Sequence, residues 1–132
     1  MLEEILDEAK ELQSFGSIDD IHEAVPDFTK RFSDERVRRG IPLKVILRDS
    51  PLARERQKSG PARLREVRLA PEGYKYSSVT YIWNDKVAMF SLTENKIAFV
   101  VESSELAEIQ RAMFFLGWNS LPVPTGFPPA RE

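Results

Sequence analysis

Apolar residues recur along the chain with two different periods, and each period predicts one kind of element. Where they return every three or four residues, a helix with one apolar stripe is predicted. Where they alternate or form short β-branched runs, a strand is predicted. The helical pattern covers residues 2–12, 18–24 and 26–39 and a last helix near the C-terminus, and the strand pattern covers residues 41–47, 64–69, 78–83, 86–92 and 97–101. The first segment also fits a helix that runs into a short strand.

Capping and turn residues mark several boundaries of these elements. Ser17 suits an N-cap, and Pro26 suits the first turn of the next helix, where its missing N–H does no harm. Asn84 and Asp85 form a favourable tight turn between two strands. Residues 97–101 are almost continuously apolar, which predicts a central strand buried on both sides.

The last predicted helix is capped by Ser104 and carries more apolar residues than one stripe can hold. Its predicted buried stripe consists of Leu106, Ile109, Met113 and Leu116, and Trp118 is a further candidate for it. Phe114, Phe115 and Trp118 flank that stripe, so we expect them to face a second copy of the chain. The pattern therefore predicts a homodimer.

The order of elements predicts an α/β fold, in which a mixed β-sheet is flanked by helices. One domain of this kind accounts for residues 1–121. Residues 122–132 are rich in proline, which predicts a C-terminal tail without regular structure.

Composition excludes several classes of protein. The 132 residues contain no cysteine, so disulfides and thiolate chemistry are absent. The acidic N-terminal segment is unlike a signal peptide, and no apolar run is long enough to span a bilayer. We expect a cytoplasmic protein that does not bind membranes.

Charge is unevenly distributed along the chain. Residues 36–68 hold 11 basic and 3 acidic side chains, whereas residues 1–35 hold 3 basic and 11 acidic ones. The basic region is either an anion-binding surface or the partner of acidic helices in the same fold.

Motifs for catalysis and cofactor binding are missing from the sequence. His22 is the single histidine and lies between acidic residues of a predicted surface helix, so we expect no metal site. No phosphate-binding glycine loop, dinucleotide fingerprint or nucleophile elbow occurs, and we expect no cofactor.

Several segments, in their order and spacing, resemble the phospholipase-D-like effector domain of TrmB-type transcriptional regulators, which are common in archaea. These segments are QSFGSIDDI, FTKRFSDERVRRGIPLKVI, LREVRLAP, VTYIWNDKVAMFSL and IAFVVESSELAEIQRAMFFLGW. The resemblance covers residues 2–121. It implies the phospholipase-D-like fold and a part in dimer formation and sensing. It also implies that DNA is bound only through a helix-turn-helix, which is absent from this chain.

Catalytic phospholipase D enzymes share the motif H-x-K-x-x-x-x-D, which falls here on Asn84, Lys86 and Ser91. Only the lysine is kept. An asparagine amide cannot form the covalent phosphoenzyme that the histidine forms. The resemblance therefore implies the fold without the reaction, and we expect no enzyme activity.

The expected function is a non-catalytic regulatory domain that dimerises and senses a small anionic or sugar-like ligand. Lys86 is the first candidate ligand contact, beside Asn84. The weaker candidates, chosen for their places on or beside strands, are Arg48, Arg65, Arg68 and Glu102. Two alternatives remain: a nucleic-acid-binding module that uses the basic region, and a remnant phosphodiesterase.

Overall fold

A strand that the sequence pattern only hinted at, β1 (Leu12–Gly16), lies in the middle of the sheet. The structure is a computed structural model that describes residues 2–127. Its other strands are β2 (Leu43–Leu47), β3 (Arg65–Leu69), β4 (Ser78–Trp83), β5 (Lys86–Ser91) and β6 (Ala98–Glu102). Its helices are α1 (Leu2–Glu8), α2 (Ile18–Ala24), α3 (Phe28–Arg38), α4 (Pro51–Ser59) and α5 (Ser104–Trp118), with a 3-10 turn η1 (Pro61–Arg63).

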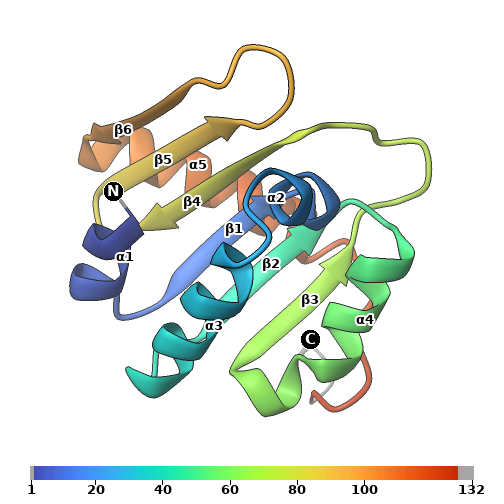
Figure 1. Ribbon diagram of the computed structural model, residues 1–132. Coiled ribbons are helices and arrows are strands. Elements are labelled where there is room, and N and C mark those ends of the chain that lie inside the picture. The colour runs from blue at the N-terminus through green and yellow to red at the C-terminus, as the bar shows by residue number, and fades with distance from the viewer. Residues whose placement is uncertain (1, 128–132) are drawn as a thin grey trace.

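The six strands form one mixed sheet in the order β3-β2-β1-β4-β5-β6. Strands β1, β2 and β3 are parallel, whereas β4, β5 and β6 form an antiparallel meander. Strand β1 joins the two halves because it pairs with β2 on one side and with β4 on the other. The predicted α/β fold with a mixed sheet flanked by helices is confirmed (Figure 1).

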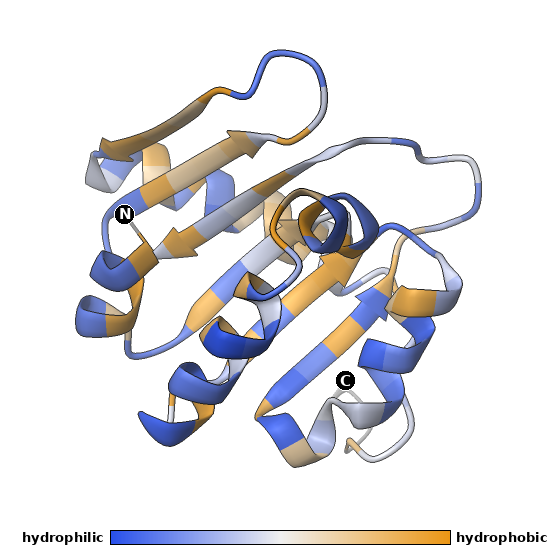
Figure 2. Cartoon of the chain, viewed as in Figure 1, coloured by the Kyte–Doolittle hydropathy of each residue, from blue (hydrophilic) through white to orange (hydrophobic). Residues whose placement is uncertain are grey.

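Helices cover both sides of the sheet, with α1, α2 and α3 on one side and α5 on the other (Figure 1). We call these the α1–α3 side and the α5 side. On the α1–α3 side, Leu12, Tyr81 and Trp83 belong to one buried cluster. On the α5 side, Ile46, Ile82 and Val87 pack against α5 in a second cluster. Figure 2 shows apolar residues along the strands and polar ones on the outward surfaces of α3 and α4.

Two predictions are corrected by the structure, one about the sheet and one about the last helix. The segment predicted as a central strand, residues 97–101, lies at the edge as β6, and its residues are exposed or half-buried. Neither face of this edge strand is fully covered, because Ala98 on one face and Phe99 on the other are both exposed. The last helix is capped by Ser103, whose side chain accepts a hydrogen bond from the N–H of Leu106, and not by Ser104.

The orientation of α5 is the reverse of the predicted one. Its four regularly spaced apolar residues, expected to be buried, have exposed fractions from 51% to 77%. They are Leu106, Ile109, Met113 and Leu116. The residues packed on the sheet are Ala107, Phe114 and Trp118, which are at most 4% exposed.

The C-terminal segment leaves α5 and runs without helix or strand through residues 122–127. The rest of the predicted tail, residues 128–132, lies outside the described residues. Among the described residues, no helix combines the length and apolar character needed to cross a bilayer.

Candidate functional site

Lys86, the first candidate ligand contact, is held by two carboxylates of α1. It begins β5 and points to the α1–α3 side, where α1 lies over the end of the β4–β5 hairpin. Its Nζ lies 2.9 Å from Oε1 of Glu4 and 2.9 Å from Oε1 of Glu8. The indole Nε1 of Trp83 donates to the same Glu8 oxygen at 3.1 Å. The ammonium is therefore already paired within the chain.

These hydrogen bonds stabilise the charged forms of their partners. Hydrogen bonds from Lys86 and then from Trp83 lower the pKa of Glu8 below its ordinary value. Hydrogen bonds to Glu8 and Glu4 raise the pKa of Lys86. The cluster holds α1 against the sheet, so its role is structural.

The backbone conformation of the turn before Lys86 favours an asparagine at position 84. Its φ of 49° lies in the left-handed region, which asparagine tolerates better than most residues. Its side-chain amide donates to the backbone oxygen of Glu8 at 3.2 Å. Its own carbonyl accepts from Nη2 of Arg111 at 2.8 Å. The residue at the histidine position of the catalytic motif thus shapes a two-residue hairpin turn.

Glu102 is the third predicted residue at this end of the sheet, because it pairs in register with Lys86 across β5 and β6. The structure thereby brings Asn84, Lys86 and Glu102 together. Ser91, at the aspartate position of the motif, lies at the opposite end of β5 and bonds within the β5–β6 loop. The motif positions therefore do not converge.

The three candidate arginines lie apart from this cluster and from each other. Arg48 donates to the backbone oxygen of Tyr76 at 2.9 Å. Arg68 lies on the α5 side and forms an ion pair with Glu66 at 2.9 Å. Its guanidinium carbon lies over the ring of Trp118, 4.2 Å from the ring centre. Arg65, on the α1–α3 side of the same strand, is also buried. They form no common ligand site.

Arg36 is a buried charged residue that sequence reasoning missed. Arg36 is 1% exposed and donates to the backbone oxygens of Ile41, Arg63 and Leu64. Burial and then the nearby Arg65 lower the pKa of Arg36 to about 10. The Nε of Arg65 has no hydrogen-bond partner among the described residues. Arg36 has no carboxylate partner there either, so this part of the interior carries excess positive charge.

Of the predicted interface residues, Phe114 and Trp118 are core residues. They are 4% and 3% exposed and stack with ring centres 5.5 Å apart. Phe115 is half-buried, with the ammonium of Lys44 at 5.5 Å from its ring centre. Phe114 and Trp118 hold α5 on the sheet, so neither is available to a partner.

The exposed apolar surface lies on the opposite flank of α5 and on the neighbouring strands. Phe15, Met89 and Phe99 are in one cross-strand row, through Thr80, and are 36% to 45% exposed. Met89 shares the α5 side with Val87, two residues before it, because strand side chains alternate. We call this row, with the four exposed residues of α5, the α5 surface.

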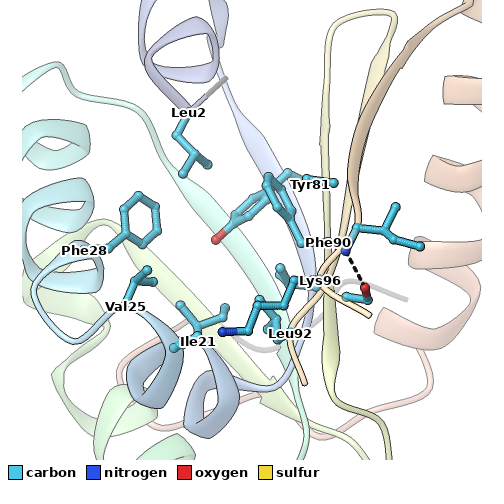
Figure 3. Close-up of a pocket in the computed structure, with 13 residues that line it drawn as sticks. Leu2, Ile21, Val25, Phe28, Tyr81, Phe90, Leu92 and Lys96 are labelled. Carbon is cyan, nitrogen blue, oxygen red and sulfur yellow. Dashed lines mark hydrogen bonds between the residues drawn. The ribbon is translucent and has the colours of Figure 1, made fainter. Parts of the chain in front are cut away.

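A cavity of about 280 Å³ opens on the α1–α3 side, between α2, the start of α3 and strands β4 to β6 (Figure 3). Its lining is almost entirely apolar and includes Phe28 and Phe90. Tyr81 and Lys96 supply its polar groups together with Ser91. Sequence reasoning noted the aromatic cluster around Tyr81 but did not place it in a cavity.

No three His, Cys, Asp or Glu residues within the described part of the chain lie close enough together to hold a metal ion. The titratable clusters of the structure are ion pairs and buried arginines, and none has the form of a metal centre.

Comparison with known proteins shows a likeness to solved structures. No family model matches the chain, and no curated protein matches it either. Among solved structures, TrmBL2, described as an archaeal chromatin protein with a novel mode of DNA binding, is similar with a TM-score of 0.54 at 18% identity. The match covers 87% of this chain and 43% of TrmBL2, so this chain spans less than half of that protein. The chain therefore shares its fold with part of a TrmB-like protein.

Proposed function

We propose that this chain is a non-catalytic regulatory domain of a TrmB-type transcriptional regulator and that it forms a homodimer through the α5 surface. The likeness to part of TrmBL2 supports the regulatory assignment. The observation that carries the dimer is the exposure of Leu106, Ile109, Met113 and Leu116 on a single flank of one helix. Large apolar side chains that are exposed next to one another are typical of protein interfaces.

The spacing of the exposed residues suits an antiparallel pair of α5 helices. Their intervals of three, four and three residues repeat as in a coiled-coil seam. The pattern reads the same in both directions around residue 111. A two-fold axis there sets Leu106 against Leu116 of the partner subunit and Ile109 against Met113 of the partner subunit, which is an isologous contact.

Charge on α5 also favours the antiparallel arrangement. Glu105 and Glu108 lie in the first turns of α5, and no basic residue lies in the last turn. A parallel pair would bring these carboxylates close to their copies. An antiparallel pair places them at opposite ends of the interface and aligns the helix dipoles favourably.

The absence of catalysis belongs to the same proposal. Asn84 and Lys86, at two positions of the phospholipase D motif, are committed to a turn and to an ion-pair cluster. An occupied ammonium is poorly placed to hold a phosphate oxygen. Turnover of a phosphodiester reporter by the purified chain, lost in Lys86→Ala, would contradict this part.

Sensing of a small anionic ligand completes the proposal, at a place other than Lys86. DNA contact is assigned to a helix-turn-helix elsewhere in the regulator. The arginines of the basic region support that assignment, because most of them bond to groups of the same chain.

Light scattering after size exclusion tests the dimer directly. We expect a dimer at micromolar concentration for the native chain and a monomer for Met113→Glu, because an acidic side chain would be buried without a partner. Val25→Glu is the matched control, since Val25 is 44% exposed at the end of α2, on the side of the sheet opposite to the α5 surface, and it should remain dimeric. A monomeric native chain, or equal behaviour of both variants, would refute the proposed interface.

A further inference from the structure

We infer that the cavity on the α1–α3 side binds a small apolar molecule that ends in a carboxylate. This inference names a ligand class for the sensing role in the proposed function. The regulatory meaning of the binding rests on that proposed function. The binding itself is measured without reference to the dimer. The cavity lies on the side of the sheet opposite to the α5 surface.

Size and lining define the apolar part of the ligand. The cavity measures about 280 Å³, whereas an apolar cavity of about 150 Å³ in a protein already binds benzene. Side chains of Ile21, Val25 and Phe28 face those of Phe90 and Leu92 across it (Figure 3). A chain or ring system of about ten non-hydrogen atoms fits this space, and a sugar does not, because its hydroxyls would lack partners.

Tyr81 supplies a hydrogen-bond donor to this cavity. Its side chain is 7% exposed, and its hydroxyl makes no hydrogen bond to any described residue. Burial raises the pKa of Tyr81 to about 12, so the hydroxyl stays protonated and can donate. Figure 3 shows its oxygen directed into the cavity. A ligand oxygen at this place would accept a hydrogen bond from the hydroxyl.

The positive charge of Lys96, with no acidic residue in the lining, makes an anionic acceptor the best match. Lys96 lies along the cavity with its nitrogen toward Ile21 (Figure 3), and its ammonium forms no ion pair with a described residue. The buried guanidinium of Arg36 does not line the cavity, but its charge acts on Tyr81 and partly opposes the rise of the phenol pKa that burial causes. No acidic residue lines the cavity. Asp20 and Glu23 border a neighbouring hollow that also touches Lys96, but neither pairs with it.

Calorimetry with octanoate tests the inference on the native chain. We expect one site with a dissociation constant of tens of micromolar. For the about ten non-hydrogen atoms of octanoate, this value lies between those that the binding energies per atom of very small and of drug-sized ligands would give. 1-Octanol and octylamine should bind at least about tenfold more weakly, because they lack the carboxylate. Binding of 1-octanol as tight as that of octanoate, or no heat from octanoate at millimolar concentration, would overturn it.

Three variants locate the site. Lys96→Glu and Tyr81→Phe should each weaken octanoate binding about tenfold, by charge and by loss of one donor. Ala98→Phe should abolish binding, because a phenyl group on β6 would fill the cavity. Lys75→Glu is the matched control in a distant loop and should bind normally. Thermal melts establish that each variant is folded, and unchanged affinity in a folded Lys96→Glu and a folded Ala98→Phe would refute the site.

The dimer measurement separates this inference from the proposed function. Met113→Glu, expected to be monomeric, should still bind octanoate with native affinity. Loss of octanoate binding in Ala98→Phe with an intact dimer supports the cavity. A native chain that dimerises and does not bind octanoate would leave the regulatory assignment standing and refute this ligand class.

Discussion

At the scale of single residues, Lys86 shows how one side chain positions a whole helix. It is separated by about 80 residues from the carboxylates it binds, yet it lies within 2.9 Å of both. Trp83 completes the cluster from the neighbouring strand. Helix α1 has only seven residues and would not be stable alone. Its order therefore depends on these contacts and on burial of Ile5.

The sign of the pKa shifts predicts how this cluster responds to pH. The pKa of Glu8 is lowered from 4.5, so its stabilising effect is complete above pH 4.5 and is lost as pH falls through the lower folded value. The pKa of Lys86 is raised from 10.5, so its effect is complete below pH 10.5 and is lost as pH rises further. The cluster is intact over the whole range between these limits.

We expect Lys86→Met to lower the melting temperature at pH 7 and to flatten its fall below pH 4.5, because Glu8 then keeps only the side-chain hydrogen bond from Trp83. Circular dichroism melts across pH measure both effects. Lys75→Met, an exposed loop lysine, is the control and should follow the native curve. If Lys86→Met retained the native acid dependence, the cluster would not hold α1.

At the scale of elements, α5 carries two apolar stripes, and packing decides which one meets the sheet. The regular stripe at residues 106, 109, 113 and 116 is the exposed one. The buried stripe contains Ala107, Phe114 and Trp118, with Arg68 stacked on the indole. Periodicity alone cannot distinguish them, because both have helical spacing.

The two stripes predict different costs for truncation. Trp118→Ala should lower the free energy of unfolding by about 3–5 kcal/mol, because it leaves a cavity beneath α5. Leu116→Ala, two residues away and 77% exposed, should change it by less than about 0.5 kcal/mol. Urea denaturation at a concentration low enough for the monomer measures both. Equal costs would mean that α5 does not pack as described.

At the scale of the whole molecule, most basic side chains of residues 36–68 make contacts within the protein. Arg36 and Arg68 bond to backbone oxygens, and Arg54 pairs with Asp49. Among the basic residues of 36–68, Lys44, Arg56 and Lys58 donate no hydrogen bond to a described group. Few basic side chains of this region are therefore available to bind the phosphate groups of a nucleic acid.

Fluorescence anisotropy with a DNA duplex tests this view of the basic region. We expect binding by the isolated chain no tighter than about 100 µM at 150 mM salt, the weak end of non-specific association. Arg56→Ala should change this little. Micromolar binding that weakens steeply with salt would favour the nucleic-acid-binding alternative.

The sequence predicted the fold better than the candidate site, for identifiable reasons. The β4–β5 hairpin and its Asn84 turn follow from local pattern and turn chemistry, and both are confirmed. For the first segment the sequence left two alternatives open, and the structure confirms the helix that runs into a short strand, since the five residues of β1 pair with β2 and β4. The pairing of Lys86 with α1 and the burial of Arg36 depend on distant segments. No local pattern shows which charged residue will be used inside the protein.

The central place of β1 also has a consequence for how the chain folds during synthesis. The segment Leu12–Gly16 emerges early, but its antiparallel neighbour, β4, begins only at Ser78. A nascent chain that ends before β4 would leave one edge of β1 open to strands of other molecules. Gly16 makes the eventual closure tight, because a Cβ there would lie 2.7 Å from a methyl carbon of Val79. Completion of the meander, rather than of the parallel half, is therefore the step that protects this protein from aggregation.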